Sequence, residues 1–332
     1  MTERILIVGP GAIGGIFAGY LAAAGKPVTV LARGVTAKLI ATEGIRLTTP
    51  DMQKLHGRPR VITDATEVGE QDIVLVTTKA FSLPEAMALA RPAIGPRTLV
   101  APVLNGVPWW FGTIEAPVRA IDPDGSLVRA VAPENLVGGT TYSPAHRTAA
   151  GEWVHTVPGK LTLGASIRGG STVNAERIAR IFEGTAFGAV VSPDVHRAVW
   201  SKLVTNGTFN PFCSITGTPQ RDIARDERLG PVALAIMREI EALAKAAGSG
   251  IQLDNPIEKQ FEQARERGIH KPSTLQDFEA GRQVELAAIV EAPLELAARY
   301  GVSMPMLSAI GGAARLKAIA LGLMPGITSP HQ

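Results

Sequence analysis

The chain has 332 residues, which suggests two domains, because a single hydrophobic core rarely grows past about 250 to 300 residues. Hydrophobic residues at 45% and charged residues at 19% exclude a disordered chain, and a net charge of +3 without any block of like charges offers no footprint for a nucleic acid. The single cysteine, Cys213, excludes an intrachain disulfide framework and has apolar neighbours, so we expect it to be packed. The six histidines lack metal-ligand spacing. We therefore expect a cytoplasmic protein without a metal site.

The first elements lie in the uncharged run between Ile5 and Gly25. Its length could span a bilayer or imitate a secretory signal, but glycines and Pro10 cluster where a turn would lie. We favour a strand, a turn and a helix, and expect no membrane association. Further apolar runs separated by helical stretches predict an α/β fold with a Rossmann-type, doubly wound parallel sheet. The predicted strands are residues 5–8, 27–31, 73–76 and 98–104.

The pattern changes after about residue 134. Residues 136–144, 153–164 and 188–192 are typical of strands, and from Pro193 onward helical periodicity dominates. The helices predicted there cover residues 195–209, 229–247, 256–268, 273–300 and 304–322. We therefore predict a Rossmann-type domain over residues 1–192 and an all-α domain over residues 193–332.

A glycine-rich turn joins the first strand to the first helix. Gly9, Gly11 and Gly14 have the spacing of a dinucleotide-binding turn, with Ala12 and Ile13 at the start of the helix. The first glycine permits a tight turn, the second lets the backbone approach a pyrophosphate, and the third allows close packing of helix and strand. A purely structural turn is the alternative, but the complete strand–turn–helix–strand context favours dinucleotide binding.

The end of the second strand indicates which dinucleotide binds. An NAD site usually has an acidic residue there for the ribose 2′-hydroxyl, but residues 15–42 contain none. Arg33 ends this strand, with Lys38 about one helical turn beyond, and a guanidinium pairs well with a 2′-phosphate. We therefore predict NADP(H) as the cofactor; the alternative is that Arg33 is a solvated surface charge.

Two polar residues follow later strands of the predicted sheet. Ligands of open α/β sheets bind at the carboxyl ends of the strands, where Lys79 and Asn105 would lie. We expect Lys79 to approach phosphate or ribose oxygens and Asn105 to hold the nicotinamide ribose. Either residue could instead be an ordinary polar residue of a loop.

Residues 194–217 carry the strongest indication of catalysis. Lys202, Asn206 and Asn210 recur every four residues and therefore share one helix face. Two asparagines and Pro211 suit a solvated helix poorly, and such local inconsistency is typical of functional sites. Either this face is an ordinary polar exterior, or Lys202 donates a proton while the two amides bind hydroxyl and carbonyl oxygens. Burial would lower the pKa of that ammonium toward neutrality.

A second polar cluster lies in the predicted helix over residues 273–300. It consists of Ser273, Gln276, Asp277 and Glu285. The apolar run after Glu285 predicts that this carboxylate is buried, and we name Lys202 as its partner. Asp277 could instead serve a structural role by pairing with Arg282.

Together these residues resemble the ketopantoate reductase family, the 2-dehydropantoate 2-reductases, over nearly the whole chain. The resemblance comprises Gly9–Gly15, Leu31–Gly34, Lys79, Leu104–Val107, Trp200, Lys202, Leu203, Asn206, Asn210, Pro211, Ser273, Leu275–Asp277, Glu279–Arg282 and Glu285. It implies NADPH-dependent reduction of a small 2-oxo acid, with hydride passing to the keto carbon.

The resemblance also implies a role for each matching residue. Lys202 would donate the proton to the carbonyl oxygen, and Glu285 would lie near the nicotinamide ribose and this lysine. Asn206, Asn210 and Ser273 would hold the substrate. The leading expectation is thus reduction of ketopantoate for pantothenate synthesis.

Several positions depart from the family pattern. Gln220 and His270 stand where the family carries asparagines, and Leu286 opens an apolar stretch where the family favours an aspartate and an Asn-Gly pair. Residues 108–138 are longer than the family's usual link and begin with the sequence PWWF. This segment is either a lid that closes over the active site or aromatic packing against the sheet edge.

Two other functions stay open. The departures fit a paralogue that reduces a bulkier or more apolar 2-oxo acid, and a non-enzymatic NADP-binding sensor would need only the glycine turn. Retention of the polar set argues against the sensor: Lys202, Asn206, Asn210, Ser273 and Glu285. The true substrate, the direction of the reaction and the oligomeric state are open, with a homodimer as one option.

Overall fold

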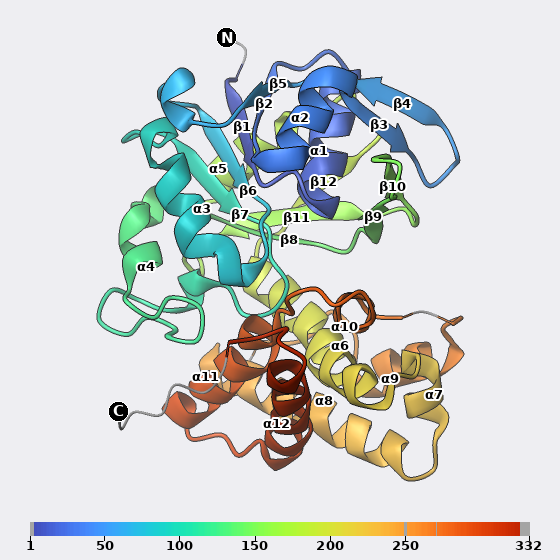
Figure 1. The fold of residues 1–332 in the computed structure, drawn as a ribbon. Coiled ribbons are helices and arrows are strands. Elements are labelled where there is room, and N and C mark those ends of the chain that lie inside the picture. The colour runs from blue at the N-terminus through green and yellow to red at the C-terminus, as the bar shows by residue number, and fades with distance from the viewer. Residues whose placement is uncertain (1–2, 249–250, 270, 326–332) are drawn as a thin grey trace. The chain divides into compact units, whose positions relative to one another are not determined.

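The computed structural model describes residues 3–248, 251–269 and 271–325, which form two compact units (Figure 1). The α/β unit comprises the chain up to Leu104, Gly112–Pro117 and Asp124–His196. The helical unit comprises Asn105–Phe111, Val118–Pro123 and the chain from Arg197 onward. Residues 1–192 and 193–332 remain our proposal for the functional domains, and the compact units differ from it chiefly in the two short segments that group with the helices.

A parallel five-stranded sheet forms the centre of the α/β unit (Figure 1). Its order is β5 (Arg60–Ile62), β2 (Val28–Leu31), β1 (Ile5–Val8), β6 (Ile73–Val76) and β7 (Leu99–Pro102). Every position of β1, β6 and β7 is buried, as expected of apolar strands covered on both faces. The predicted doubly wound α/β fold is confirmed.

The helices of this unit lie between its strands in sequence. They are α1 (Ala12–Ala23), α2 (Gly34–Glu43), α3 (Leu83–Ala90), α4 (Ser126–Ala130) and α5 (Val173–Arg180). The uncharged run of residues 5–25 is β1, the glycine turn and α1, so neither the membrane nor the signal interpretation is needed. Among the residues that the structure describes, no helix is long and apolar enough to cross a membrane.

Two smaller sheets complete the α/β unit. One has the order β4 (Lys54–Gly57), β3 (Ile45–Thr48), β10 (Trp153–His155) and β9 (Ala145–Arg147), and the other β12 (Gly188–Val191), β11 (Lys160–Ala165) and β8 (Val137–Thr141). The prediction of one strand over residues 153–164 is wrong, because Pro158 and Gly159 lie between β10 and β11, which belong to different sheets. The prediction also missed β3, β4, β5 and β9, which are short and carry charged or polar residues.

Strand β10 contacts the long helix α1 through a buried polar pair. The Nδ1 atom of His155 lies 3.0 Å from the hydroxyl oxygen of Tyr20, and both residues are about 2% exposed. Burial lowers the pKa of the His155 imidazole and raises the pKa of Tyr20 to about 12. The ring is therefore held in its neutral form within the folded core.

We expect this neutral histidine to make the protein less stable in acid. Below about pH 6.5 the unfolded chain protonates a histidine that the folded core resists protonating, so the free energy of unfolding falls as the pH decreases. His155→Gln keeps an acceptor for Tyr20 but cannot titrate, so its stability should fall less between pH 7.5 and pH 5. Urea unfolding across this range measures the two slopes. His146→Gln, at an exposed position of β9, should keep the wild-type slope; equal slopes for all three proteins would contradict the prediction.

The helical unit is built from seven α-helices among the described residues (Figure 1). They are α6 (Val195–Thr216), α7 (Gln220–Arg225), α8 (Leu229–Ala247), α9 (Ile257–Glu266), α10 (Ser273–Glu279), α11 (Ala292–Tyr300) and α12 (Pro305–Ala320). The all-α architecture predicted for this part of the chain is confirmed. Helix α6 continues through Pro211 to Thr216 rather than ending at residue 209, although the proline cannot donate a backbone hydrogen bond there.

The predicted continuous helix over residues 273–300 is wrong. Helix α10 ends at Glu279, and Gly281 adopts a φ of 63°, a left-handed conformation that glycine tolerates and that stops the helix. The chain becomes helical again at Leu286, passes through a π-helical segment at Ala287–Glu291 and continues as α11. Glu285 therefore lies just before a helix start and not on the helix that carries Ser273.

Candidate active site

The glycine turn has the geometry that close approach of a pyrophosphate requires. Gly9 has a φ of 81°, and the Gly15 N–H donates to the Gly11 carbonyl at 3.0 Å, which begins α1. A Cβ on Gly14 would overlap the Thr77 hydroxyl and the Gly9 carbonyl, whereas a Cβ on Gly11 would meet nothing within 4 Å. The backbone at Gly11 thus borders open space, and the first N–H groups of the helix, including those of Ala12 and Ile13, have no partner within the helix itself.

The neighbouring strand holds this turn in place. The hydroxyl of Thr77, directly after β6, donates to the carbonyls of Val8 and Gly9 at 3.0 and 2.9 Å. Replacing Gly14 would therefore displace both the turn and this threonine. The sequence reasoning did not assign Thr77 a role, because a single threonine after a strand carries no specific pattern.

Arg33 lies at the end of β2, where the prediction placed it, and is exposed. Its guanidinium forms an ion pair with the carboxylate of Glu85, which comes from the first turn of α3. Lys38 is exposed on α2. The sequence contains no acid near Arg33, but the fold supplies one from a helix about fifty residues away, so a 2′-phosphate at Arg33 would have Glu85 as a neighbour.

Lys79 and Asn105 fall in different units. Lys79 follows β6, is half-buried and caps a short 3₁₀ turn at Ala80–Ser82, within the α/β unit. Asn105 follows β7 but groups with the helical unit. There the Val107 N–H donates to the Ala288 carbonyl at 2.8 Å, and a Cβ on Gly106 would overlap that carbonyl. The loop of Asn105 is thus packed on the π-helical segment that follows Glu285.

Helix α6 brings the three predicted polar residues onto one element. Lys202 and Asn206 are half-buried, and Asn210 is 3% exposed. Burial lowers the pKa of the Lys202 ammonium to about 8, and the carboxylate of Glu285, itself 5% exposed, acts in the opposite direction. The predicted neighbourhood of Lys202 and Glu285 is therefore present, and it leaves a lysine that can exchange a proton near neutral pH.

The side-chain amide of Asn210 has an unsatisfied donor. Its Nδ2 atom is buried and has no hydrogen-bond partner among the described residues, while its backbone carbonyl accepts from the Ser214 hydroxyl at 2.7 Å. An unsatisfied buried donor costs about 1 to 3 kcal/mol. A substrate oxygen at this position would remove that cost, which is what a substrate-binding amide requires.

Ser273 is the exposed first residue of α10. Lys317 of α12 links that helix to the end of α6, since its Nζ atom lies 5.7 Å from the ring centroid of Phe278 and donates to the Ser214 carbonyl at 2.6 Å. The structural alternative for Asp277 is present: its carboxylate accepts from Arg282 at 2.9 Å. The structure therefore supports the structural role of Asp277, which pairs with Arg282. Ser273 remains accessible to solvent.

The positions that depart from the family pattern are apolar or buried where the structure describes them. Gln220 is 3% exposed at the start of α7. Leu286 is buried, and Ala287 and Ala288 begin the π-helical segment. His270 lies outside the described residues.

The aromatic cluster at the start of residues 108–138 is packed. Trp109 is 0% exposed and Trp110 is 7% exposed. The ring of Phe111 lies 4.8 Å from Trp110 and 5.3 Å from Trp200 of α6, measured between centroids. The aromatic residues are thus packed, but the partner shown is Trp200 of helix α6, whereas the expectation was packing against the sheet edge.

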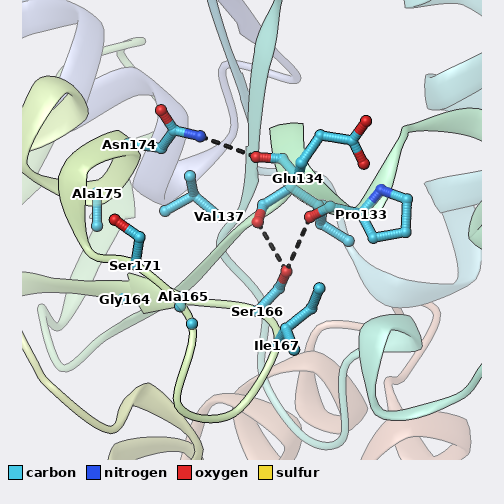
Figure 2. A pocket seen from close by; sticks show the side chains of 12 residues that line it. Pro133, Glu134, Val137, Gly164, Ala165, Ser166, Ile167, Ser171, Asn174 and Ala175 are labelled. Carbon is cyan, nitrogen blue, oxygen red and sulfur yellow. Dashed lines mark hydrogen bonds between the residues drawn. The ribbon is translucent and has the colours of Figure 1, made fainter.

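Two other features lie outside the candidate site. Cys213 is fully buried, and burial raises the pKa of its thiol to about 12, so a thiolate nucleophile is disfavoured and the expectation of a packed cysteine is confirmed. A cavity of about 300 Å³ lies in the α/β unit, and Figure 2 shows the side chains that line it. Two of its polar side chains donate to backbone carbonyls, Ser166 to Leu136 at 2.7 Å and Asn174 to Glu134 at 2.8 Å, and no predicted site residue lines it.

Comparison with known proteins agrees with this arrangement. Residues 5–167 match the family described as ketopantoate reductase PanE/ApbA, and residues 194–318 match its C-terminal part. The chain is 31% identical to the 2-dehydropantoate 2-reductase of Mesorhizobium japonicum, over 96% of this chain and 99% of that protein.

Solved structures show the same similarity. A candidate ketopantoate reductase from Ralstonia solanacearum MolK2 has a TM-score of 0.88 and 34% identity, covering 98% of this chain and all of that one. The 2-dehydropantoate 2-reductase of Geobacter metallireducens has a TM-score of 0.83 and 27% identity, covering 95% and 99%. The chain therefore belongs to the ketopantoate reductase family and is an oxidoreductase of the type that acts on CH–OH groups.

Proposed function

We propose that this protein reduces 2-dehydropantoate (ketopantoate) to pantoate with NADPH, as a step of pantothenate biosynthesis. The observation that carries this proposal is Lys202, whose pKa is about 8, on the same helix face as two amides and beside the Glu285 carboxylate. In a chain of the ketopantoate reductase family, this set supplies a proton donor and hydrogen-bonding groups for a 2-oxo acid.

The residues of the glycine turn fit a dinucleotide, because the backbone at Gly11 borders open space that a pyrophosphate can enter. The N–H groups of Ala12 and Ile13 would bind the pyrophosphate and Arg33 the 2′-phosphate. Lys79 would approach phosphate or ribose oxygens. The reduced nicotinamide, when bound, supplies the hydride that the keto carbon accepts.

The nicotinamide ribose would be held by residues of the helical unit. Asn105 and Glu285 are linked there through the hydrogen bond from Val107 to Ala288, three residues after the glutamate. We propose that both side chains bind ribose hydroxyls. Packing of the Asn105 loop on the segment after Glu285 fixes the two groups with respect to each other.

Lys202 would provide the proton for the reaction. Its Nζ atom donates a proton to the substrate carbonyl oxygen as the carbon is reduced, and the Glu285 carboxylate favours the protonated lysine at neutral pH. The amides of Asn206 and Asn210 and the hydroxyl of Ser273 would bind the hydroxyl, keto and carboxylate groups of the substrate. The buried Nδ2 donor of Asn210 supports this role, since it lacks a partner among the described residues.

A second candidate is a reductase for a bulkier or more apolar 2-oxo acid. The observation that favours it is the apolar segment from Leu286 to Ala288, in which Leu286 and Ala288 are fully buried and where the family favours polar residues. In that case the same lysine and amides would act on a different side chain of the substrate.

Initial rates with NADPH separate the two candidates. A kcat/KM for ketopantoate at or above about 10⁴ M⁻¹ s⁻¹ supports the first, and a much lower value together with a higher one for aromatic or branched 2-oxo acids supports the second. Activity with none of these acids would contradict both.

A further inference from the structure

Trp153 makes an unexpected contact with the glycine turn. It lies in β10, outside the sheet that carries the turn, and is 0% exposed. Its indole Nε1–H donates to the Gly11 carbonyl at 2.8 Å, across 142 residues of sequence. A Cβ on Gly15 would overlap this indole ring, so the absence of a side chain at Gly15 is what admits the tryptophan.

This hydrogen bond helps to fix the orientation of one peptide group, whose carbonyl also accepts from the Gly15 N–H at 3.0 Å. In a planar trans peptide, the carbonyl of one residue and the N–H of the next point in opposite directions. Because the Gly11 carbonyl is held toward Trp153, the Ala12 N–H is held pointing away from it. That N–H is one of the donors that our proposed function assigns to the pyrophosphate, and a donated hydrogen bond on the carbonyl also polarises the peptide and strengthens its N–H as a donor.

The indole ring is held on another side by Arg147. The Cζ atom of this arginine lies 5.6 Å from the ring centroid, and its Nη1 atom donates to the Thr36 hydroxyl of α2 at 2.8 Å. The arginine thus joins the tryptophan to the helix that follows Arg33. The indole ring is thus held by its hydrogen bond to the glycine turn, by close packing against the backbone at Gly15 and by the Arg147 guanidinium.

We propose that Trp153 is a positioning residue for the pyrophosphate, acting through the peptide between Gly11 and Ala12. The inference rests on the proposed function, because it takes the glycine turn to be a dinucleotide site. Its indole N–H is a second donor to the Gly11 carbonyl, beside the Gly15 N–H, and further restricts the orientation of the Ala12 N–H, so it lowers the cost of binding the cofactor without touching the reacting atoms.

The test compares two variants that each remove one hydrogen bond between β10 and α1. Trp153→Phe removes the indole N–H and keeps an aromatic ring beside Gly15. Tyr20→Phe, the matched control, removes the buried bond to His155 on the same strand and helix. Both should lower the melting temperature. Only Trp153→Phe should raise the Kd and KM for NADPH, by about 3- to 10-fold, with kcat and the KM for the 2-oxo acid unchanged.

A second substitution covers the case in which Trp153→Phe does not fold. 3-Benzothienylalanine at position 153 keeps the two-ring shape and replaces the N–H by sulfur, so it should give the same rise in the Kd for NADPH. Adenosine 2′-monophosphate has no pyrophosphate and should bind equally to the wild type and to both forms changed at position 153.

The outcomes distinguish this inference from the proposed function. If the wild type binds NADPH or NADH but the forms changed at position 153 bind it as tightly as Tyr20→Phe does, Trp153 is merely structural and the inference is overturned. If the wild type binds neither dinucleotide, the proposed function itself fails, and the inference fails with it.

Discussion

Lys202→Met is expected to lower kcat/KM for the 2-oxo acid by about 10²- to 10⁴-fold, the usual contribution of a positioned general acid. Methionine keeps most of the apolar stem and removes the ammonium, so the loss would report the proton and its charge rather than the packing of α6. The Kd for NADPH, measured by fluorescence titration, should change far less than kcat. If Lys202→Met turns over the 2-oxo acid as fast as the wild type, the proton-donor role is wrong. If the wild type binds NADPH but reduces no 2-oxo acid, the sensor alternative is favoured.

The pH dependence of the same reaction follows from the lowered pKa of this lysine. Only the protonated ammonium can donate, and burial lowers its pKa to about 8, so kcat/KM for reduction should be highest below that pH and fall as the pH rises through it. Lys202→Met should lack this descending limb. Lys245→Met, an exposed lysine of α8 that pairs with Glu241, should retain it.

Arg33→Ala is expected to lower kcat/KM for NADPH by about 10- to 100-fold, which is the value of hydrogen bonds between a guanidinium and a phosphate. The rate with NADH should stay the same, since NADH has a hydroxyl at the position of the 2′-phosphate. Parallel initial-rate measurements with the two cofactors give the selectivity directly. An equal loss with both cofactors, or a wild type that prefers NADH, would contradict the assignment of NADP(H).

Glu85→Gln is the matched control for Arg33→Ala, because it removes the carboxylate that pairs with the Arg33 guanidinium. The KM for NADPH should fall modestly, since a negative charge beside the 2′-phosphate is gone. The effect is expected to be small because the two side chains are 60% and 58% exposed and water screens their charges. A rise in the KM for NADPH would instead indicate that Glu85 orients the arginine.

The parts of the site that could be predicted from the sequence are those whose residues all lie within one short segment of the chain. The glycine turn needs only its spacing and the strand and helix beside it, and the polar face of α6 needs only a repeat of four residues. Both signals depend on local geometry, in which side-chain direction follows directly from the position in the chain.

The missed contacts depend on packing between distant segments. Glu85 reaches Arg33 from another helix, and Trp153 reaches Gly11 from another sheet, so neither leaves a periodic pattern. The continuous helix predicted over residues 273–300 failed for a different reason: apolar periodicity continues on both sides of Gly281, and a single glycine in the left-handed region is enough to end a helix. The spacing of polar residues therefore predicted which side chains share the face of α6, but apolar periodicity did not predict where the helices after residue 273 begin and end.

The burial of Cys213 has a practical consequence for solution studies. With the only thiol of the chain fully buried and its pKa raised to about 12, maleimide and iodoacetamide reagents have almost no thiolate to attack in the folded protein. The native chain should therefore react very little with thiol reagents, which favours site-specific labelling of introduced cysteines. A cysteine introduced at an exposed position of each unit could carry a donor and an acceptor dye, and single-molecule energy transfer would then follow the two units through a catalytic cycle.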